Sequence, residues 1–452
     1  MIPEAFLARM RTMPSLDFDA FRAALDTPAV RALRVNPLKT NADTLLRLLP
    51  FEASPLPFGT DAFYAPEDKV GALPAHHAGM FYMQDPSAIS TVVAATPARG
   101  ARVLDLCAAP GGKSTQLAAA IAPDGILVSN EYVPARCRIL QGNMERLGVA
   151  DAVITNLSTR ALAEFYGAFF DLVVADVPCS GEGMFRKYEA ASEEWSEENV
   201  ALCAARSREI LEDAAACVRP GGRLLYSTCT FSLEENEHNI DRFLTAHPEF
   251  SLISVPPQIL DSTANGVNFT GHVQDMSTCR RFYPHLSPGE GQFIALMQKS
   301  KEGHASSGRD CATLPDKKTT ELAWRFLDEV LTVRPHARLV QLRDDLYLAP
   351  NIPIPSKGVF AAGVCIGTLV KGRVVPHHHL FSAMGRVFCR TLCLSHADRR
   401  VARYLRGEEI DAPELCGSGF ACVLYEGAPL GGGKSVDGRL KNYYPKGLRN
   451  RT

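Results

Sequence analysis

The sequence predicts an α/β protein whose central part is a doubly wound parallel sheet. Between about residue 96 and residue 299, short apolar runs alternate with helical patterns, and this alternation is typical of βαβ units. The run at 102–106 is followed by a turn of small residues and then by a helical pattern. Such a sheet presents ligands at the carboxyl ends of its strands. The chain has 452 residues, which is enough for two or three domains.

Four segments are expected along the chain. Residues 1–95 are mixed and contain many prolines, with a strand-and-turn signal at 34–39. Residues 96–299 form the predicted sheet domain. Residues 300–318 are polar, contain Gly, Ser and Pro, and are interpreted as a linker. In the remaining part, 319–452, we expect short strands at 358–360, 363–367 and 420–425 and a helix near 399–406.

The composition is that of an ordinary globular protein, with 46% hydrophobic and 22% charged residues and a formal net charge of -2. The first residues lack the basic-then-apolar pattern of a secretory signal. No apolar run reaches the roughly 18 residues that a membrane helix needs. We therefore expect a cytoplasmic protein without a membrane partner, and its 13 cysteines should stay reduced.

No metal site is expected, because the sequence contains no CxxC pair. His377-His378-His379 precedes Cys389 and Cys393, but this spacing matches no common zinc pattern. We interpret the group as a polar turn followed by cysteines of the core.

A cofactor loop is predicted after the strand at 102–106. The loop consists of Cys107, Ala108, Ala109, Pro110, Gly111, Gly112 and Lys113. Small residues allow a ligand to approach the backbone closely. Glu131 follows the next predicted strand, 20 positions after Gly111, about the offset of an acid that accepts hydrogen bonds from ribose hydroxyls.

Phosphate-binding alternatives fail for this loop. A Walker A motif would need Gly where Cys107 stands, the segment Gly433-Lys434-Ser435 has Ala428 at the corresponding position, and GxGxxG is absent. S-adenosylmethionine fits best, because it carries a ribose but no phosphate. A tight structural βα turn is the alternative interpretation of the loop alone.

Two cysteines stand at the ends of predicted strands. Cys179 lies in Asp176-Val177-Pro178-Cys179, and Cys229 lies in Ser227-Thr228-Cys229. Both are expected at the sheet edge where ligands bind. Four other cysteines are interpreted as small buried hydrophobic residues. They are Cys107, Cys137, Cys203 and Cys217.

Methylation of carbon 5 of cytosine would explain these thiols. A thiolate that adds to carbon 6 makes carbon 5 nucleophilic, so that carbon 5 can attack a sulfonium methyl group. A hydrogen bond to N3 would stabilise the charge that builds there. Asp176 is placed for that bond, provided that its carboxyl group or N3 is protonated.

Several further motifs occur in a fixed order. They are Arg34-Val35-Asn36 with Leu38-Lys39, Tyr82–Ala88, Leu104–Lys113, Asp176–Gly181, Pro220-Gly221-Gly222, Tyr226–Thr230, Glu235-Asn236-Glu237, Pro284-His285, Gly289–Gly291 with Phe293, and Leu440–Arg449. With this set the chain resembles the Nop/Sun family of RNA 5-methylcytosine methyltransferases. Within that family it is similar to the bacterial RsmF group, which acts on small-subunit ribosomal RNA. The resemblance covers nearly the whole chain.

The resemblance implies a Rossmann-like class I methyltransferase core, a small N-terminal α/β module and a C-terminal PUA-like RNA-binding region with an extension. It implies that Cys229 is the nucleophile and that Cys179 helps to release the product. Residues 107–113 would hold the methionine part of the cofactor, Glu131 its ribose, and Arg136 would brace this region. Asp176 would lie between cofactor and base, and Lys113 would contact both.

Three further interpretations concern single segments. The family often has an acid where this chain has Ser158, so cofactor affinity is expected to be lower or a backbone group to substitute. Residues 438–452 carry five cations, no acid, Tyr443 and Tyr444, which suits RNA, although a solvated tail is the alternative. Residues 232–235 are interpreted as a helix capping box, so Glu235 is not assigned to the site.

The main hypothesis is an S-adenosylmethionine-dependent RNA cytosine-C5 methyltransferase. Its expected partner is 16S-type ribosomal RNA or the small ribosomal subunit, and it is expected to act as a monomer. A transfer RNA substrate is an alternative. A DNA cytosine methyltransferase is disfavoured by the second cysteine and the C-terminal region. A ribosome assembly factor without catalysis is disfavoured because Cys229, Cys179 and Asp176 are all intact.

Overall fold

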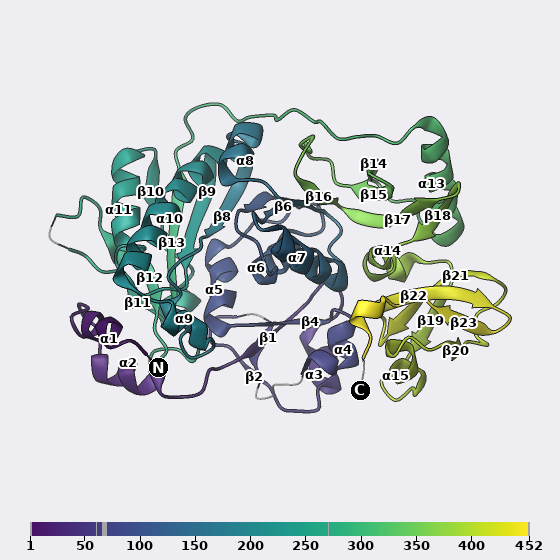
Figure 1. The fold of residues 1–452 in the computed structure, drawn as a ribbon, viewed down its shortest axis with the longest axis horizontal. Coiled ribbons are helices and arrows are strands. Elements are labelled where there is room, and N and C mark those ends of the chain that lie inside the picture. Colours follow the sequence, from purple (N-terminus) through teal and green to yellow (C-terminus); the bar gives the residue numbers. More distant parts are fainter. Residues whose placement is uncertain (1, 60, 66–69, 270, 451–452) are drawn as a thin grey trace.

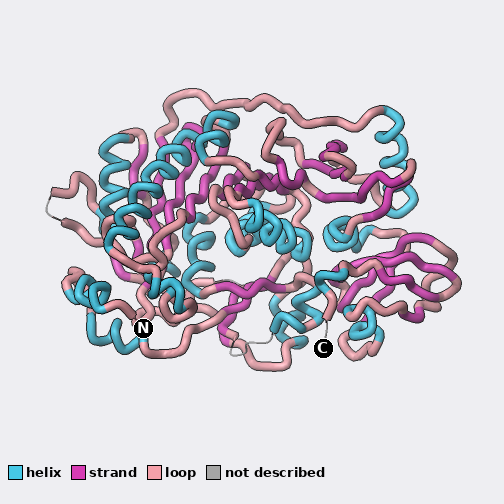
Figure 2. Tube along the Cα trace, viewed as in Figure 1, coloured by secondary structure: helices cyan, strands magenta, loops and turns pink. Residues whose placement is uncertain are grey.

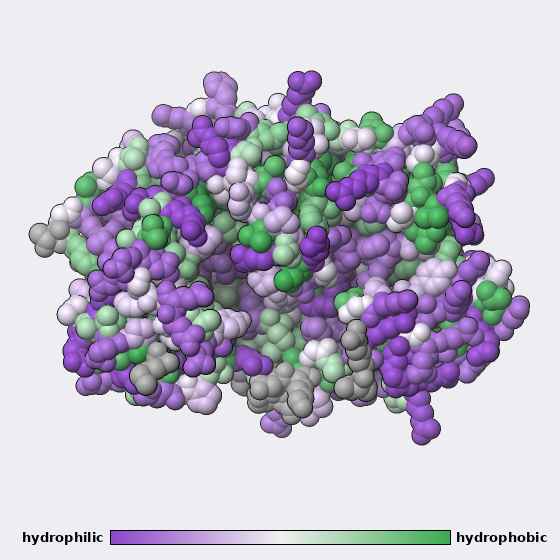
Figure 3. All heavy atoms as spheres, viewed as in Figure 1, coloured by the Kyte–Doolittle hydropathy of each residue, from purple (hydrophilic) through white to green (hydrophobic). Residues whose placement is uncertain are grey.

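A computed structural model describes residues 2–59, 61–65, 70–269 and 271–450. Figure 1 shows the sheet domain at the left and centre, the N-terminal segment along the lower edge, and the C-terminal region at the right. The face drawn in Figure 3 is largely hydrophilic and is hollowed near its centre. Among the described residues, none of the helices combines the length and the apolar character that crossing a membrane requires.

The predicted doubly wound sheet is confirmed. Its parallel strands lie in the order β9-β8-β5-β6-β7, and β13 pairs antiparallel with β9. The bounds are β5 Arg102–Asp105, β6 Ile126–Asn130, β7 Ala152–Thr155, β8 Phe170–Asp176, β9 Val218–Thr228 and β13 Gln292–Lys299. The chain leaves β5 in one direction and returns to its other side as β8, so the topological switch point lies between these two strands.

Helices cover both faces of this sheet. Helices α5 (Pro86–Ala95), α6 (Gly112–Ile121) and α7 (Pro134–Leu147) pack together against one face, and α8 (Thr159–Tyr166), α10 (Glu197–Cys217) and α11 (Glu237–Ala246) pack together against the other. The remaining elements of this domain are α9 Glu189–Glu193, α12 Pro257–Leu260, β10 Phe250–Leu252, β11 Ala264–Asn265 and β12 Arg280–Phe282. The strands read as continuous apolar runs, since both faces are buried.

The N-terminal segment divides into two parts. Strands β1 (Ala32–Val35), β2 (Ser54–Pro55), β3 (Ala62–Tyr64) and β4 (Phe81–Gln84) form a small antiparallel sheet with α3 (Ala42–Leu48) and α4 (Pro74–His77) beside it. Helices α1 (Glu4–Arg11) and α2 (Phe18–Leu25) instead pack on the sheet domain near α9, at the lower left of Figure 1. The strand-and-turn signal at 34–39 thus marks the end of β1.

The linker runs as loop from residue 300 to residue 316, along the top of Figure 2. Helix α13 (Lys317–Val330) follows it. One strand beyond the linker, β16 (Val359–Ala362), pairs antiparallel with β7 and extends the central sheet. The predicted C-terminal region is therefore not separate from the sheet domain, because it supplies one of the strands at its edge.

The rest of the C-terminal region forms two sheets. The first contains β14 Arg338–Leu342, β15 Asp345–Ala349, β17 Val364–Val370 and β18 Arg373–Pro376. The second contains β19 Thr391–Leu394, β20 Ile410–Asp411, β21 Gly419–Tyr425, β22 Ala428–Val436 and β23 Arg439–Asn442. Helices α14 (His378–Met384) and α15 (Arg400–Leu405) complete it. Strands and a helix were predicted at 358–367, 420–425 and 399–406, and all are present.

The interpretation of the histidine cluster is wrong. His378 and His379 are buried in the first turn of α14, whereas Cys389 and Cys393 are exposed. His379 Nε2 forms a hydrogen bond with the carbonyl oxygen of Val149 at 2.9 Å. The cluster therefore belongs to the contact between the C-terminal region and the sheet domain, and this long-range packing has no signature in the local sequence.

Buried side chains contribute to the contact between the C-terminal region and the N-terminal segment. Lys39, buried after β1, donates from Nζ to the carbonyl oxygens of Ser382 and Pro429. Tyr444 is buried, and its hydroxyl lies 2.8 Å from His77 Nδ1. The expectation that Tyr444 stacks on RNA is wrong, since its ring faces the protein interior.

Tyr444→Ala is expected to lower the free energy of unfolding by about 3 kcal/mol, because it removes a buried aromatic side chain. Urea unfolding followed by circular dichroism would measure this. Tyr443→Ala is the matched control, because Tyr443 is only half-buried. Equal losses for the two variants would contradict a specific role of Tyr444 in this contact.

Candidate active site

The predicted site residues come together at the carboxyl edge of the sheet. In the strand register Asp105 lies opposite Ser129 and Val174, and Asp176 lies opposite Ser227. The loops that follow β5, β6, β8 and β9 therefore start at the same level, around the switch point between β5 and β8. This is the position at which open α/β sheets bind ligands.

The loop after β5 is held close to its neighbours by backbone bonds. Ala108 N donates to the carbonyl oxygen of Asn130 at 2.8 Å. Gly111 has a φ of 114°, a left-handed conformation that favours glycine, and it caps the N-terminus of α6. A Cβ on Gly112 would lie 3.2 Å from the side chains of Tyr82 and Gln84. The N-terminal segment thus packs directly against this loop, and a larger residue at 112 would require Tyr82 and Gln84 to shift.

Glu131 and Arg136 meet beside the same loop. Glu131 is buried, and its Oε1 accepts a hydrogen bond from Val133 N at 2.9 Å. Arg136 Nη1 lies 3.5 Å from Glu131 Oε2, and Arg136 Nη2 donates to the carbonyl oxygen of Ala109 at 2.9 Å. Arg136 therefore ties the acid after β6 to the loop after β5.

The two predicted thiols are in contact. Cys179 Sγ lies 3.2 Å from Cys229 Sγ, and Cys229 N donates to Cys179 Sγ at 3.3 Å. The hydrogen bond to Cys229 and burial together raise the pKa of the Cys179 thiol well above its ordinary value. Cys179 is therefore held as a thiol that can donate to a thiolate at Cys229.

Asp176 and Lys113 form an ion pair at the same edge. Lys113 Nζ lies 2.8 Å from Asp176 Oδ2, while Ser227 Oγ and Gln292 Nε2 donate to Asp176 Oδ1 at 2.6 and 3.3 Å. Burial works to lower the pKa of Lys113, but the Asp176 carboxylate outweighs it and the pKa is raised. Ser227 and Gln292 were not predicted, although Ser227 stands two positions before Cys229.

The four cysteines interpreted as buried hydrophobes differ in their burial. Cys137, Cys203 and Cys217 are buried in helices, as expected. Cys107 is only half-buried in the cofactor loop, and burial raises the pKa of its thiol. Ser158 accepts a hydrogen bond from Ala161 N and caps α8, so its side chain is engaged in the fold.

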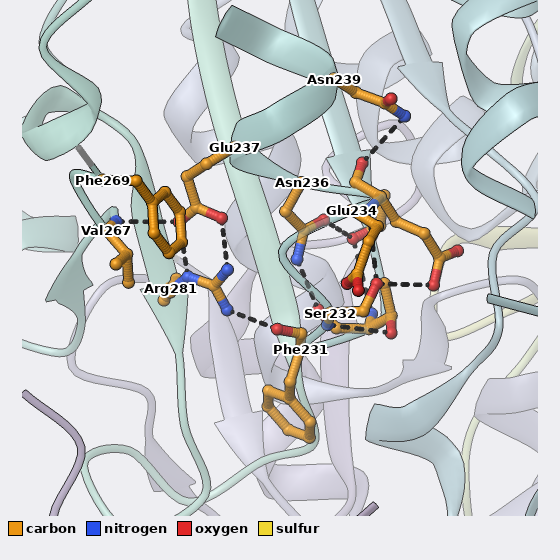
Figure 4. Close-up of polar contacts among 12 residues, drawn as sticks. Phe231, Ser232, Glu234, Asn236, Glu237, Asn239, Val267, Phe269 and Arg281 are labelled. Atoms are coloured by element: carbon orange, nitrogen blue, oxygen red, sulfur yellow. Dashed lines mark hydrogen bonds and ion pairs between the residues drawn. The ribbon is translucent and has the colours of Figure 1, made fainter. Parts of the chain in front are cut away.

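The capping box predicted at 232–235 is wrong. Helix α11 begins at Glu237, and residues 233–236 form a turn before it. Figure 4 shows this turn and the bonds that hold it. Glu235 is fully buried and accepts hydrogen bonds from Ser180 N and Oγ. Burial raises the pKa of Glu235 to about 7. The sequence did not predict that Glu235 contacts the Cys179 loop, because its partner Ser180 lies 55 positions away along the chain.

Among the described residues, no three His, Cys, Asp or Glu side chains gather in a group that could hold a metal ion. The site consists of a loop of small residues, a buried acid with an arginine, two thiols in contact and a lysine–aspartate pair.

Three segments of the chain match known family models. Residues 92–298 match 16S rRNA methyltransferase RsmB/F, residues 2–86 match the N-terminal domain of 16S rRNA methyltransferase RsmF, and residues 392–450 match the methyltransferase RsmF PUA domain. These matches confirm the expected family, including an N-terminal domain and a C-terminal PUA domain.

Relatives and solved structures agree with these matches. The ribosomal RNA small subunit methyltransferase F of Vibrio vulnificus (strain YJ016) is 32% identical over 99% of this chain and 97% of its own. That of Klebsiella pneumoniae (strain 342) is 32% identical over 99% and 96%. A methyltransferase homolog protein from Pyrococcus horikoshii superposes with a TM-score of 0.57, at 26% identity over 66% of this chain and 95% of that one. The chain therefore belongs to the ribosomal RNA small subunit methyltransferase F family, and it is an RNA methyltransferase.

Proposed function

We propose that this protein transfers a methyl group from S-adenosylmethionine to carbon 5 of a cytosine in small-subunit ribosomal RNA, with Cys229 as the nucleophile. The observation that carries the proposal is the contact of the Cys229 and Cys179 thiols at 3.2 Å, beside the pair of Lys113 and Asp176. One thiol would suffice for a nucleophile. A second thiol that stays protonated gives the nucleophile a partner for both attack and release.

The residues present fit S-adenosylmethionine. Asp105 is fully buried, and its Oδ1 has no hydrogen-bond partner among the described residues. A ligand that brought an N–H donor to this edge would therefore find an unused acceptor, and such a bond would oppose burial, which raises the pKa of Asp105 to about 7. Residues 107–113 would hold the methionine part, Glu131 would accept from the ribose hydroxyls beside its contacts with Val133 N and Arg136, and Arg136 would brace both. The cofactor supplies an electrophilic methyl group on a sulfonium.

Each side chain then has a distinct task. Cys229 adds as a thiolate to carbon 6 of the base, and the S–H of Cys179 donates to that thiolate. Asp176 accepts from three donors, and Lys113 supplies the N–H that can donate to N3 of the base as charge builds there. After carbon 5 loses its proton to a base, Cys229 leaves as a thiolate that Cys179 again stabilises.

The RNA assignment is supported by the relatives and by the C-terminal domain. The relatives are named for the small-subunit ribosomal RNA, and the PUA domain model matches at 392–450. The target base must leave its stack to reach Cys229. We also propose that the protein acts as a monomer, and a ribosomal substrate supports a cytoplasmic location.

Deletion of the gene is expected to remove protection of one or more cytosines of small-subunit ribosomal RNA in bisulfite sequencing of total RNA. Complementation with the intact gene restores the signal, and complementation with the Cys229→Ala gene does not. Loss of protection in transfer RNA instead would overturn the substrate assignment while leaving the reaction intact.

Cys229→Ala is expected to abolish methyl transfer, because no thiolate then adds to carbon 6. Cys179→Ala is expected to block turnover after addition, so that a protein–RNA complex resistant to denaturation accumulates on a gel. Radiolabelled methyl transfer and the gel measure the two effects, with the exposed Cys389→Ala as control. Turnover retained by Cys229→Ala but lost in Cys179→Ala would reverse the two roles.

Glu131→Ala is expected to weaken S-adenosylmethionine binding about 10-fold or more, because hydrogen bonds to a charged acceptor are lost. Isothermal titration calorimetry would measure the dissociation constant. Glu164→Ala serves as control, since Glu164 is exposed on α8 and pairs with Arg160. An unchanged constant for Glu131→Ala would exclude this acid from the cofactor site.

A further inference from the structure

Two buried carboxylates join the loop that carries Cys179 to the turn that follows Cys229. Glu182 and Glu235 are 1% and 0% exposed. Glu182 lies three positions after Cys179, and Glu235 lies six positions after Cys229. Each of them accepts hydrogen bonds from the opposite loop, so the arrangement is reciprocal.

Glu182 reaches from the Cys179 loop into the turn after Cys229. Its Oε2 accepts from Thr230 Oγ1 at 2.8 Å and from Phe231 N at 2.9 Å. Its Oε1 accepts from Trp195 Nε1 at 3.0 Å. Both oxygens are therefore occupied by donors, and two of the three donors belong to the residues directly after Cys229.

Glu235 reaches in the opposite direction. Its Oε2 accepts from Ser180 N at 2.9 Å, and its Oε1 accepts from Ser180 Oγ and from Ser232 Oγ. Ser180 is the residue directly after Cys179. Ser180 Oγ also lies 2.8 Å from Thr230 Oγ1, so the two halves of the network meet between the two cysteine loops.

The turn that holds Glu235 is itself anchored (Figure 4). Asn236 Nδ2 donates to the carbonyl oxygen of Thr230 at 3.0 Å. Arg281 pairs with Glu237 and donates to the carbonyl oxygen of Phe231 at 2.9 Å. The turn after Cys229 is thus fixed to the sheet domain. The Cys179 loop is joined to it by the two carboxylates and by Gly183 N, which donates to the carbonyl oxygen of Cys229 at 2.9 Å.

Aromatic rings from the N-terminal helices cover the network. Phe6 of α1 packs edge-on against Phe185 at 5.1 Å, and Phe21 of α2 packs edge-on against Phe231 at 5.2 Å between ring centroids. The two carboxylates beneath these rings are almost fully buried, and a hydrogen bond in such surroundings is stronger than one in water. The same burial raises the pKa of both Glu182 and Glu235.

Stability alone does not account for the two carboxylates. Burying ionisable groups is costly, and well-packed apolar residues often replace them without loss of stability. Neither carboxylate contacts a catalytic sulfur, since each acts through Ser180, Thr230 or the backbone. What the network does define is the distance between the residues that follow the two cysteines.

We propose that Glu182 and Glu235 are positioning residues, which set the distance between the Cys179 and Cys229 sulfur atoms by bonding each cysteine loop to the other. This role rests on the proposed function of the two thiols. A displacement of about 1 Å in such a pair costs on the order of 100-fold in rate, so the spacing decides whether Cys179 can serve Cys229.

The hydrogen-bond inventory predicts different outcomes for two similar substitutions. In Glu235→Gln the amide oxygen can accept from Ser180 N, and the NH₂ group can donate to the Ser180 and Ser232 hydroxyls. In Glu182→Gln the side-chain amide has two orientations. One places its NH₂ group against Trp195 N–H and the other against Phe231 N–H, and neither N–H can accept a hydrogen bond. Gln is therefore tolerated at 235 and not at 182. Glu235→Ala removes the acceptors altogether.

The first measurement is the rate at which diamide converts Cys179 and Cys229 into a disulfide. The two thiols lose two hydrogens, which reduce diamide to the hydrazine. Mass spectrometry of proteolytic digests measures the fraction of protein that carries the Cys179–Cys229 disulfide at each time. Glu182→Gln, Glu235→Ala and Thr230→Val should slow this reaction at least about 10-fold, while Glu235→Gln and the control Glu145→Gln, half-buried in α7, should match the wild-type protein.

The second measurement is turnover with RNA. In Glu182→Gln and Glu235→Ala kcat should fall about 100-fold with an unchanged KM for RNA, and the covalent complex should accumulate as in Cys179→Ala. Glu235→Gln should restore turnover. A folded Glu182→Gln protein with wild-type disulfide rate and kcat would overturn the proposal, as would Glu235→Gln failing as severely as Glu235→Ala. If the wild-type protein methylates no RNA, the proposed function fails, and the disulfide rate still decides the positioning role.

Discussion

The structure of this site depends on the parallel register of β8 and β9. Because Asp176 lies opposite Ser227, strands β8 and β9 end at the same level of the sheet. Cys179 follows Asp176 by three residues and Cys229 follows Ser227 by two, and their sulfur atoms lie 3.2 Å apart. A register shifted by one residue would turn the side chains of one strand to the other face. The pairing of β8 with β9, which consists mostly of buried apolar residues and ends at Asp176 and Ser227, therefore determines whether a two-thiol site exists.

The loops beyond that register have no sheet to hold them. Their order comes from polar groups that are withdrawn from water, and these groups act because the N-terminal helices and their aromatic rings close over them. The N-terminal segment thus contributes to the site twice. Its helices α1 and α2 cover the cysteine loops, and its strand β4 supports the cofactor loop through Tyr82 and Gln84. Removal of this segment would expose both, so the N-terminal domain packs as part of the surroundings of the proposed site.

Local patterns were sufficient to place a residue where its position follows from its own strand or loop. The doubly wound sheet, the loop at 107–113, Glu131 and the two strand-end cysteines follow from periodicity and position, and Arg136 came from the family resemblance. Sequence was insufficient where a partner lies far along the chain. Ser232 and Glu235 have the spacing of a capping box, and they do hydrogen-bond to each other, but Ser180 competes for the same carboxylate and no helix starts there. His378, His379 and Tyr444 look like surface residues in the sequence and are buried because three segments meet around them.

The contacts among the N-terminal segment, the sheet domain and the C-terminal region bear on how RNA would reach the proposed site. The C-terminal region is bonded to the sheet domain through β16 and His379, and to the N-terminal segment through Lys39 and Tyr444. Burial lowers the pKa of Lys39 to about 7, a cost offset by the two carbonyl groups that its amine bonds. A region that shares a strand with the sheet domain and forms these buried bonds is not expected to move as an independent domain. On the proposed function, an RNA bound by the PUA domain would then offer to Cys229 only those bases that the distance between the two allows.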